Sequence, residues 1–372
     1  GVTVDKASGS VYLGANFSLS SAFILTSGTM YLRDSGAVTN YSMTLTSTYS
    51  QGGGTMNTGS SAFSVSGAFS QTSGTFNGGS STVGHTGTFS LSGGTYSQST
   101  GTTTYGSTFT HTAGGTFTHN SGTSLFSGSS SSIDVGTTET FGHLTISLTG
   151  GQTKTVANST TLIVSGTLTL TDGSVSQTTI PTAGTISAQG NVVGASTYDG
   201  GTGKLIFSGS ATQTFDLTGA AGVYNGDIAV NKAGGAVNLL TALTMDASGQ
   251  DLVIEEGTFD VSGFTLSVTG AGTETIIVET GGNLQLQGGE TITGDSASYP
   301  QLNSGSTVTY DGTSTPYTLK DYTYHHLTIA GGASSVFTLA ANESLGGNLT
   351  LTTGILSQGG FTLAVTGTFS NG

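Results

Sequence analysis

The 372-residue sequence has no cysteine, only three prolines and only six basic residues. The absence of cysteine is compatible with export. Twenty acidic residues outweigh the six basic ones and leave a formal charge of −14. Phosphate binding draws on clustered lysine and arginine, and we therefore expect no nucleic-acid partner.

Long apolar runs are also missing. No stretch of about 18 apolar residues occurs, which predicts that no segment spans a membrane. A basic membrane-surface helix is excluded as well, because no aspartate, glutamate, lysine or arginine lies between Ser35 and Ile133. No signal peptide is visible, and Gly1 is compatible with a mature terminus or with the start of a piece of a longer chain.

What the sequence has in abundance is glycine, serine and threonine, arranged around apolar residues that recur every twenty positions. Its 62 glycines alone are compatible with a disordered linker, but a linker does not keep aromatic residues in register. Four columns repeat with this period, the last with one inserted residue: Tyr49, Phe69, Phe89 and Phe109; Leu45, Val65, His85 and Tyr105; Met43, Phe63, Val83 and Thr103; Met56, Phe76, Tyr96 and Phe117. A fixed period of this kind indicates stacked repeats.

Within one repeat the apolar residues alternate as they do in a strand. Met43, Leu45 and Tyr49 share a parity and would project from one face of an extended chain. A glycine-containing corner then shifts the parity before Met56. Such a coil cannot bury its own side chains, but stacked coils place like residues above like. We predict an all-β chain, a β-solenoid with coils of about twenty residues, with these columns inside and essentially no helix.

Three segments with different textures suggest the domain organisation. Residues 1–36 contain N-terminal strands, residues 37–130 contain the twenty-residue repeat, and residues 131–372 contain longer β modules that continue the solenoid. The modules span about 131–200, 201–300 and 301–372. Their clearest shared motif is GFTLSVTG from Gly263 and GFTLAVTG from Gly360.

These modules resemble a known class of proteins. An apolar-x-apolar-Tyr/Phe-x-Gly pattern, a Tyr/Phe-x-x-Leu-Thr-Ile strand and the closing Gly-Phe-Thr-Leu-x-Val-Thr-Gly are similar to the β-strand repeats of very large secreted prokaryotic surface proteins. They are also broadly similar to the β-helical passengers of autotransporters and to filamentous-haemagglutinin-like adhesins. The resemblance covers roughly residues 130–372. It implies a right-handed parallel β-helix at the cell surface and carries over no catalytic residue.

Catalytic and metal-binding patterns are weak. Polysaccharide-cleaving β-helices need acids gathered in a groove, often with arginine or lysine. Arg33 is the only arginine, and the densest acidic group is Asp251, Glu255, Glu256 and Asp260, which is typical of a solvated edge or, less often, a weak cation site. His85 and His111 fall in inward columns and favour hydrogen-bonded imidazoles over metal ligands. We expect no enzyme activity, no cofactor and no metal site.

Surface features favour an extracellular location. The chain is rich in serine and threonine and poor in lysine, and five Asn-x-Ser/Thr sequences begin at Asn16, Asn40, Asn158, Asn342 and Asn348. Composition alone would supply several such sequences by chance, so their glycosylation stays open.

The leading hypothesis is a structural protein, a subunit of an extracellular filament or surface layer. The alternative is an adhesin stalk or fibre-like module that binds glycans or other cell-surface components. Both ends of the sequence are strand-like and have no polar cap or helix, which favours self-association head to tail by β-augmentation, unless the ends mark a fragment. The residues expected to contribute are Val2, Val4, Lys6, Val11 and Leu13 at one end and Phe361, Leu363, Val365 and Phe369 at the other.

Overall fold

The chain is all β. A computed structural model describes residues 1–112, 114–177, 184–219, 223–270, 274–295, 299–314 and 316–372. These residues contain no helix, and their parallel strands stack into a β-solenoid of about 16 turns with about 22 residues per turn. The predicted solenoid is confirmed. Its turns exceed twenty residues on average because they lengthen after the N-terminal array: Tyr49 pairs with Phe69, but Thr161 pairs with Thr185.

The chain divides into two compact units. The first comprises residues 1–188 and 197–203, and the second comprises residues 189–196 and 204–372. The strands up to residue 188 are β1 (Val2–Tyr12), β2 (Phe17–Leu19), β3 (Phe23–Tyr31), β4 (Met43–Leu45), β5 (Tyr49–Gln51), β6 (Thr55–Asn57), β7 (Phe63–Val65), β8 (Phe69–Gln71), β9 (Thr75–Asn77), β10 (Val83–His85), β11 (Phe89–Leu91), β12 (Gly94–Ser97), β13 (Thr102–Tyr105), β14 (Phe109–Thr110), β15 (Gly115–Thr118), β16 (Thr123–Phe126), β17 (Ser131–Asp134), β18 (Thr138–Phe141), β19 (His143–Ser147), β20 (Thr153–Val156), β21 (Thr161–Val164), β22 (Leu168–Gln177) and β23 (Thr185–Ala188).

Strand β24 (Val192–Gly200) contributes residues to both units. The strands that follow are β25 (Lys204–Phe207), β26 (Gln213–Asp216), β27 (Ile228–Leu239), β28 (Leu243–Met245), β29 (Leu252–Asp260), β30 (Leu266–Val268), β31 (Ile276–Val278), β32 (Gly282–Leu286), β33 (Ile292–Gly294), β34 (Gln301–Leu302), β35 (Thr307–Tyr310), β36 (Tyr317–Thr318), β37 (His326–Ala330), β38 (Val336–Thr338), β39 (Glu343–Leu345), β40 (Leu349–Thr353), β41 (Ile355–Ser357), β42 (Leu363–Val365) and β43 (Phe369–Asn371).

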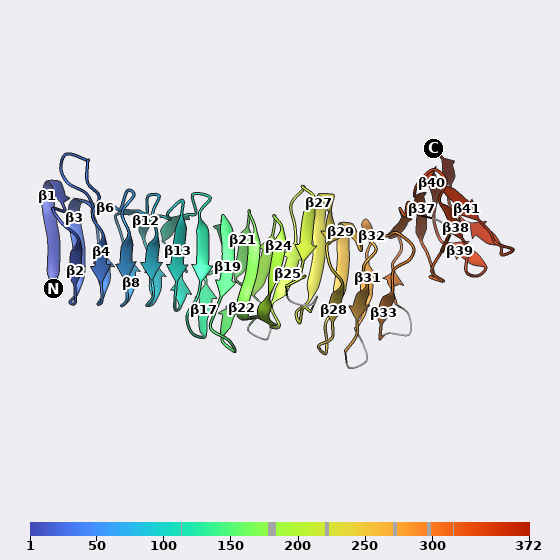
Figure 1. Cartoon of the computed structure of the whole chain (residues 1–372), viewed down its shortest axis with the longest axis horizontal. Helices are drawn as coiled ribbons and strands as arrows, with labels where there is room; N and C mark the ends of the chain where they lie inside the picture. The colour runs from blue at the N-terminus through green and yellow to red at the C-terminus, as the bar shows by residue number, and fades with distance from the viewer. Residues whose placement is uncertain (113, 178–183, 220–222, 271–273, 296–298, 315) are drawn as a thin grey trace. The chain divides into compact units, whose positions relative to one another are not determined.

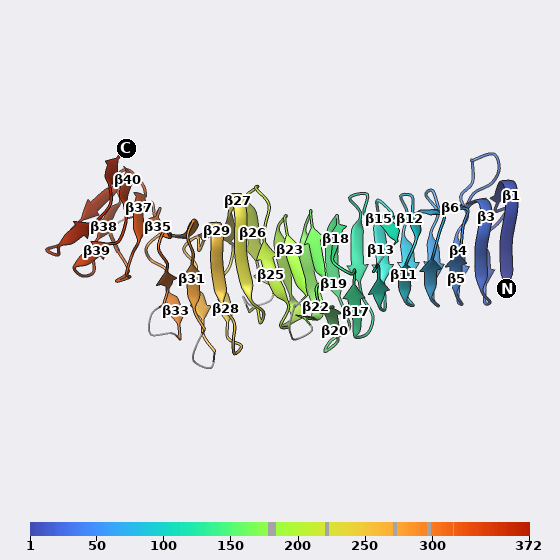
Figure 2. The same cartoon turned by 180° about the vertical axis from the view of Figure 1, so that it is seen from behind.

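In the twenty-residue array each turn contributes three short strands, and equivalent strands of successive turns form parallel ladders (Figures 1 and 2). The three ladders pass through Met43, Phe63, Val83 and Thr103; through Tyr49, Phe69, Phe89 and Phe109; and through Met56, Phe76, Tyr96 and Phe117. Leu45 and Val65 lie in the first ladder as well. The repeat period therefore coincides with one turn of the backbone in this part of the chain.

The aromatic residues of the second ladder form a continuous stack. Ring centroids lie 4.9 Å apart between Tyr49 and Phe69, 5.1 Å between Phe69 and Phe89, and 4.8 Å between Phe89 and Phe109. The rings are nearly parallel, with interplanar angles of 9°, 6° and 10°. Strand spacing sets this separation, since like residues on adjacent parallel strands lie about 4.8 Å apart.

Phe117 departs from the expectation that all sixteen column residues lie inside. It is half-buried, whereas the other fifteen are at most 1% exposed. Its ring stacks on Tyr96 at 5.7 Å. Among the described residues, however, β15 forms a ladder with β12 and with no strand on its other edge. On that side the Phe141 ring contacts Phe117 at 5.5 Å, but no paired strand in the described part of the chain completes the cover.

Glycine at the corners is required by both conformation and space. Gly74 has φ of +73°, a region that L side chains rarely adopt, and a Cβ there would lie 2.4 Å from the carbonyl oxygen of Gly54. Gly94 repeats this arrangement one turn later, with φ of +76° and a Cβ position 2.3 Å from the oxygen of Gly74. The glycines thus let adjacent turns approach closely at the corner.

The interior also holds polar side chains that the column pattern did not predict. Gln71 is fully buried, and its Nε2 donates to the carbonyls of Gly74 and Thr95. Lys154 is fully buried, and its Nζ donates to the carbonyl of Ser129 at 3.3 Å and to the hydroxyl of Ser131. Burial lowers the pKa of Lys154 to about 8.

The interior of the second unit is mainly aliphatic, with buried rings such as Phe259 and Tyr310 among the aliphatic side chains. Its ladders pair Leu252 with Ile276, Leu266 with Ile292, and Leu327 with Leu349. All but Ile292 and Leu349 among these are fully buried. Alternating Leu, Ile and Val in the longer modules therefore serve the purpose that aromatic rings serve in the first unit.

Candidate functional site

A polar pocket lies where the chain leaves the coil after β3. Arg33 and Asn40 form an isolated antiparallel bridge that closes the excursion. Asp34 stabilises the loop, because its Oδ1 accepts a hydrogen bond from the backbone N–H of Val38 at 2.8 Å. Ala37 completes the turn with a φ of 58°. An Asp side chain that bonds to backbone a few residues on is a typical turn-former, which explains the loop at this point.

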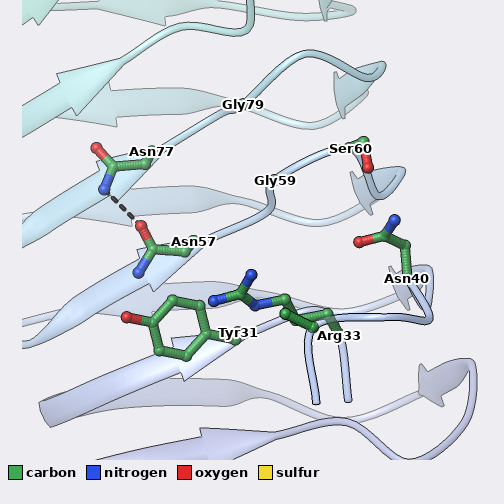
Figure 3. Close-up of a pocket in the computed structure, with 9 residues that line it drawn as sticks. Tyr31, Arg33, Asn40, Asn57, Gly59, Ser60, Asn77 and Gly79 are labelled. Atoms are coloured by element: carbon green, nitrogen blue, oxygen red, sulfur yellow. Dashed lines mark hydrogen bonds between the residues drawn. The ribbon is translucent and has the colours of Figure 1, made fainter. Parts of the chain in front are cut away.

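The pocket has a volume of about 490 Å³. Its lining consists of Tyr31, Arg33, Ala37, Asn40, Asn57, Gly59, Ser60, Asn77 and Gly79 (Figure 3). The only arginine of the chain lies here, and its Cζ is 4.8 Å from the centroid of the Tyr31 ring. Tyr12 stacks on the same ring, with the two centroids 5.1 Å apart and an interplanar angle of 10°. The two tyrosines thus form a platform that holds the guanidinium by cation–π attraction.

Two asparagines on successive turns form one wall of the pocket. Asn77 Nδ2 donates to Asn57 Oδ1 at 2.6 Å, and Figure 3 shows the two amides stacked one above the other. Asn57 and Asn77 occupy equivalent positions of the repeat and pair directly in the β6–β9 ladder. Gly59 and Gly79 repeat beside them, and a Cβ on Gly79 would lie 1.7 Å from the oxygen of Gly59. The repeat therefore builds an amide ladder on a closely packed backbone.

The electrostatics of the pocket are dominated by Arg33. The single ion pair among the described residues joins His111 to Glu139, so Arg33 has no carboxylate within ion-pair distance. Its Nε is shielded from solvent and has no hydrogen-bond partner. Asp34 lies next to it and is half-buried, and its carboxylate is committed to the loop. The bond from Val38 lowers the pKa of Asp34, and Arg33 adds to the effect.

Sequence reasoning missed this pocket. It noted Arg33 only as the single arginine and assigned residues 1–36 to a separate segment. A signal was nevertheless present, because Asn57 and Asn77 are spaced by the repeat period of twenty. The position of Arg33 against that ladder depends on the loop, whose course the repeat does not determine.

The N-terminal residues expected to assist assembly lie on or next to β1. Val2, Val4, Val11 and Leu13 are half-buried and Lys6 is exposed. Strand β1 pairs with β3, but the register shifts between Val4 and Asp5 and again before Ser10. A regular edge therefore covers Val2–Val4 and Ser10–Tyr12, and Lys6 lies in the irregular part between them. This is shorter than the continuous Val2–Lys6 edge expected from the alternation.

The direction of the hydrogen bonds tells which backbone groups face outward. The N–H of Val2 donates to the carbonyl of Ala22 at 2.9 Å, so the backbone groups of Val2 face β3 and those of Thr3 face away. At the other end, the N–H of Leu349 donates to the carbonyl of Thr368 at 3.0 Å, which leaves the groups of Phe369 facing away from β40.

The C-terminal residues of the assembly hypothesis are only partly covered. The side chains of Phe361 and Phe369 are 39% and 59% exposed, and Leu363 and Val365 are half-buried. Leu363 pairs with Glu343 in the β39–β42 ladder, and Phe369 pairs with Leu349 in the β40–β43 ladder.

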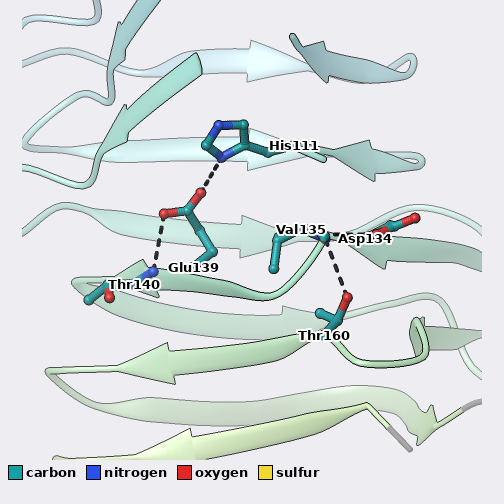
Figure 4. Close-up of polar contacts among 7 residues, drawn as sticks. His111, Asp134, Val135, Glu139, Thr140 and Thr160 are labelled. Carbon is teal, nitrogen blue, oxygen red and sulfur yellow. Dashed lines mark hydrogen bonds and ion pairs between the residues drawn. The ribbon is translucent and has the colours of Figure 1, made fainter. Parts of the chain in front are cut away.

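The two inward histidines have different environments. His85 is fully buried, its Nε2 lies 2.7 Å from the Tyr96 hydroxyl, and burial lowers its pKa to about 3. His111 is half-buried and its Nδ1 bonds to the carboxylate of Glu139, which raises the pKa of His111 (Figure 4). Thr140 supports the carboxylate by donating its backbone N–H to Oε1 at 3.2 Å. Both imidazoles thus have hydrogen-bond partners within the fold.

The acidic group is spread along one strand and its flanks. Asp251 Oδ1 accepts from the backbone of Thr275 at 3.0 Å, and Glu255 Oε2 accepts from Asn231 at 2.7 Å, while Glu256 is exposed. Asp260 Oδ1 accepts from the backbone of its neighbour Ser262 at 2.7 Å. In the described part of the chain no three His, Asp or Glu side chains come together in a way that would hold a metal ion.

Three of the five Asn-x-Ser/Thr asparagines link successive turns. The side-chain oxygens of Asn16, Asn342 and Asn348 accept from the backbone N–H groups of Ser42, Thr362 and Thr368 at 2.9–3.0 Å. Asn40 lines the pocket described above. These asparagines therefore have a structural reason to be present, independent of modification.

No helix in the described residues is long and apolar enough to cross a membrane. The sequence matches no protein-family model, and no curated protein and no solved structure matches it either.

Proposed function

We propose that the chain is a structural protein of the cell surface or extracellular space, a β-solenoid subunit of a filament or surface layer whose copies join head to tail. The observation that carries this proposal is the in-register stack of inward side chains, with one backbone ladder continuing from turn to turn. Such a stack is extended by adding turns, and each added turn meets the same backbone pattern.

The edges supply the proposed contact. The outward backbone groups of Thr3 on β1 and of Phe369 on β43 have no ladder partner among the described residues. A β43 edge meeting the β1 edge of a second copy would pair these groups as successive turns are paired within the chain. Because the two edges differ, the contact is heterologous. Copies joined by such a contact form an open filament unless the rotation between successive copies closes a ring. The resemblance to the repeats of secreted prokaryotic surface proteins supports the same function and location.

The test is a proline at the outward-facing position. Thr3→Pro removes an N–H that points away from β3 and leaves the bonds of Val2 to β3 intact. We expect Thr3→Pro to shorten or abolish fibres of purified residues 1–372 in negative-stain images, with an unchanged melting temperature. The matched control, Thr3→Val, keeps the N–H and should assemble as the parent does. Fibres of normal length from Thr3→Pro, or a parent chain that stays monomeric at every concentration, would contradict the proposal.

A glycan-binding surface module is the second candidate, and the pocket around Arg33 is the observation that favours it. The two functions are compatible, because Arg33 lies after β3 and the two asparagines lie on β6 and β9, whereas the proposed assembly contact uses β1 and β43.

A further inference from the structure

We propose that the Arg33 pocket binds an acidic saccharide, one that carries a carboxylate beside several hydroxyl groups. Arg33 would bind the carboxylate, and Asn57 and Asn77 would bind hydroxyls. The inference concerns ligand binding and does not depend on head-to-tail assembly.

Arg33 is a cation without an ion-pair partner among the described residues. A guanidinium presents planar donors that match a carboxylate in a two-pronged arrangement. The described residues place no carboxylate within ion-pair distance of Arg33, and its shielded Nε has no partner. The Tyr31 ring, itself stacked on Tyr12, holds the guanidinium in place, which lowers the conformational cost of binding. Tyr31 is therefore a positioning residue.

The amides of Asn57 and Asn77 supply the neutral hydrogen-bonding groups of the pocket. The bond between the two asparagines uses Nδ2 of Asn77 and Oδ1 of Asn57. It leaves Nδ2 of Asn57 as a donor and Oδ1 of Asn77 as an acceptor at the pocket. A sugar hydroxyl both donates and accepts, so an adjacent donor and acceptor suit it better than they suit a phosphate, which only accepts at full ionisation.

The charge of the pocket lining and the volume of the pocket also match an acidic saccharide. The pocket lining contains one charged residue, Arg33, among neutral side chains, and the chain as a whole carries −14. One cation beside several neutral polar groups matches a ligand with one negative charge per sugar. The negative net charge of the chain repels ligands of high negative charge density. A volume of about 490 Å³ lies within the range of small-ligand pockets, roughly 300–1,000 Å³.

The experiment is calorimetric titration with oligosaccharides of galacturonate, mannuronate and N-acetylneuraminate, each beside its neutral counterpart, and with a sulfated oligosaccharide. We expect at least one carboxylated oligosaccharide to bind, its neutral counterpart to bind at least about tenfold more weakly, and added salt to weaken binding. Arg33→Gln should weaken binding about tenfold or more, and Arg33→Lys less, because it keeps the charge but not the fork.

Two further variants control for charge, and a third tests the contribution of Asn57. Lys6→Gln removes the same charge from an exposed position of the same unit and should leave the affinity unchanged. Asp34→Asn keeps the oxygen that accepts from Val38 but removes the carboxylate beside Arg33, so it should tighten binding a few fold. Asn57→Ala should weaken binding to the carboxylated oligosaccharide, and the melting temperature of each variant shows whether it is folded.

Several outcomes would overturn the proposal. These are the absence of binding across the panel, equal binding of neutral counterparts, preference for the sulfated oligosaccharide, or binding that persists in a folded Arg33→Gln variant.

Discussion

Replacing Phe89 by alanine should destabilise the first unit by about 4 kcal/mol. The side chain is 1% exposed, and its ring lies between Phe69 and Phe109 with edge contacts to Tyr96 at 4.9 Å and Tyr105 at 5.2 Å. Truncation of a buried phenylalanine costs about 3–5 kcal/mol. The lower end of that range does not apply, because the backbone ladders on both sides hold the neighbouring turns apart and keep the cavity from collapsing.

Phe89→Leu separates the contributions of volume and ring stacking. It keeps most of the apolar volume but loses the aromatic pairs, each worth about 0.5–1.5 kcal/mol beyond area. We expect a loss of about 2–3 kcal/mol for Phe89→Leu, near the lower limit for four such pairs and smaller than the loss for Phe89→Ala. Phe361→Ala is the exposed control, since its ring is 39% exposed, and it should cost less than about 1 kcal/mol.

The assay must report on the site itself, because a chain of two units and many turns need not unfold in one step. Amide hydrogen exchange followed by mass spectrometry gives the opening free energy of peptides from residues 83–110. The chain has no tryptophan, so tyrosine fluorescence during urea unfolding gives a second signal, from all 13 tyrosines including Tyr96 and Tyr105 beside Phe89. If Phe89→Ala lowered the opening free energy no more than Phe361→Ala does, the argument from the stacked column would be wrong.

The remaining predictions concern a corner and the two inward histidines. Gly74→Ala should cost more than about 2 kcal/mol in urea unfolding, because a Cβ adds a backbone clash to an unfavourable φ, whereas Gly14→Ala, with open space around its Cβ, should be nearly neutral. His85 has a lowered pKa of about 3, so the unfolded chain takes up a proton near pH 6.5 that the folded chain refuses, and the melting temperature should fall as the pH drops from 6.5 toward 3, less so in His85→Val. His111 has a raised pKa because it bonds to Glu139, so its contribution is complete below pH 6.5 and disappears as the pH rises through the raised value; His111→Gln should remove this alkaline loss, and an unchanged alkaline profile would count against the pair.

Much of the fold could be predicted from periodicity because stacking depends on one relation, the distance along the chain between equivalent positions. When Phe69 and Phe89 are one turn apart, their contact follows from strand spacing whatever the shape of the corners. The parity of Lys154, which matches that of buried Val156, also pointed inward. Charge made an inward lysine unexpected, because the carbonyl of Ser129 that accepts its hydrogen bond lies on another turn and cannot be recognised in a strand pattern.

The sequence by itself determined the class of fold, the inward columns of the repeat and the absence of a basic surface. Tertiary structure decided where the pattern stops. Phe117 keeps its place in the column but is half-buried, because only one edge of its strand is paired. Arg33 lines the same pocket as Asn57 and Asn77 only because of the course of the loop after β3. Periodic contacts are encoded locally and repeated, whereas a pocket depends on the course of one irregular loop against several turns, for which no periodic signal exists.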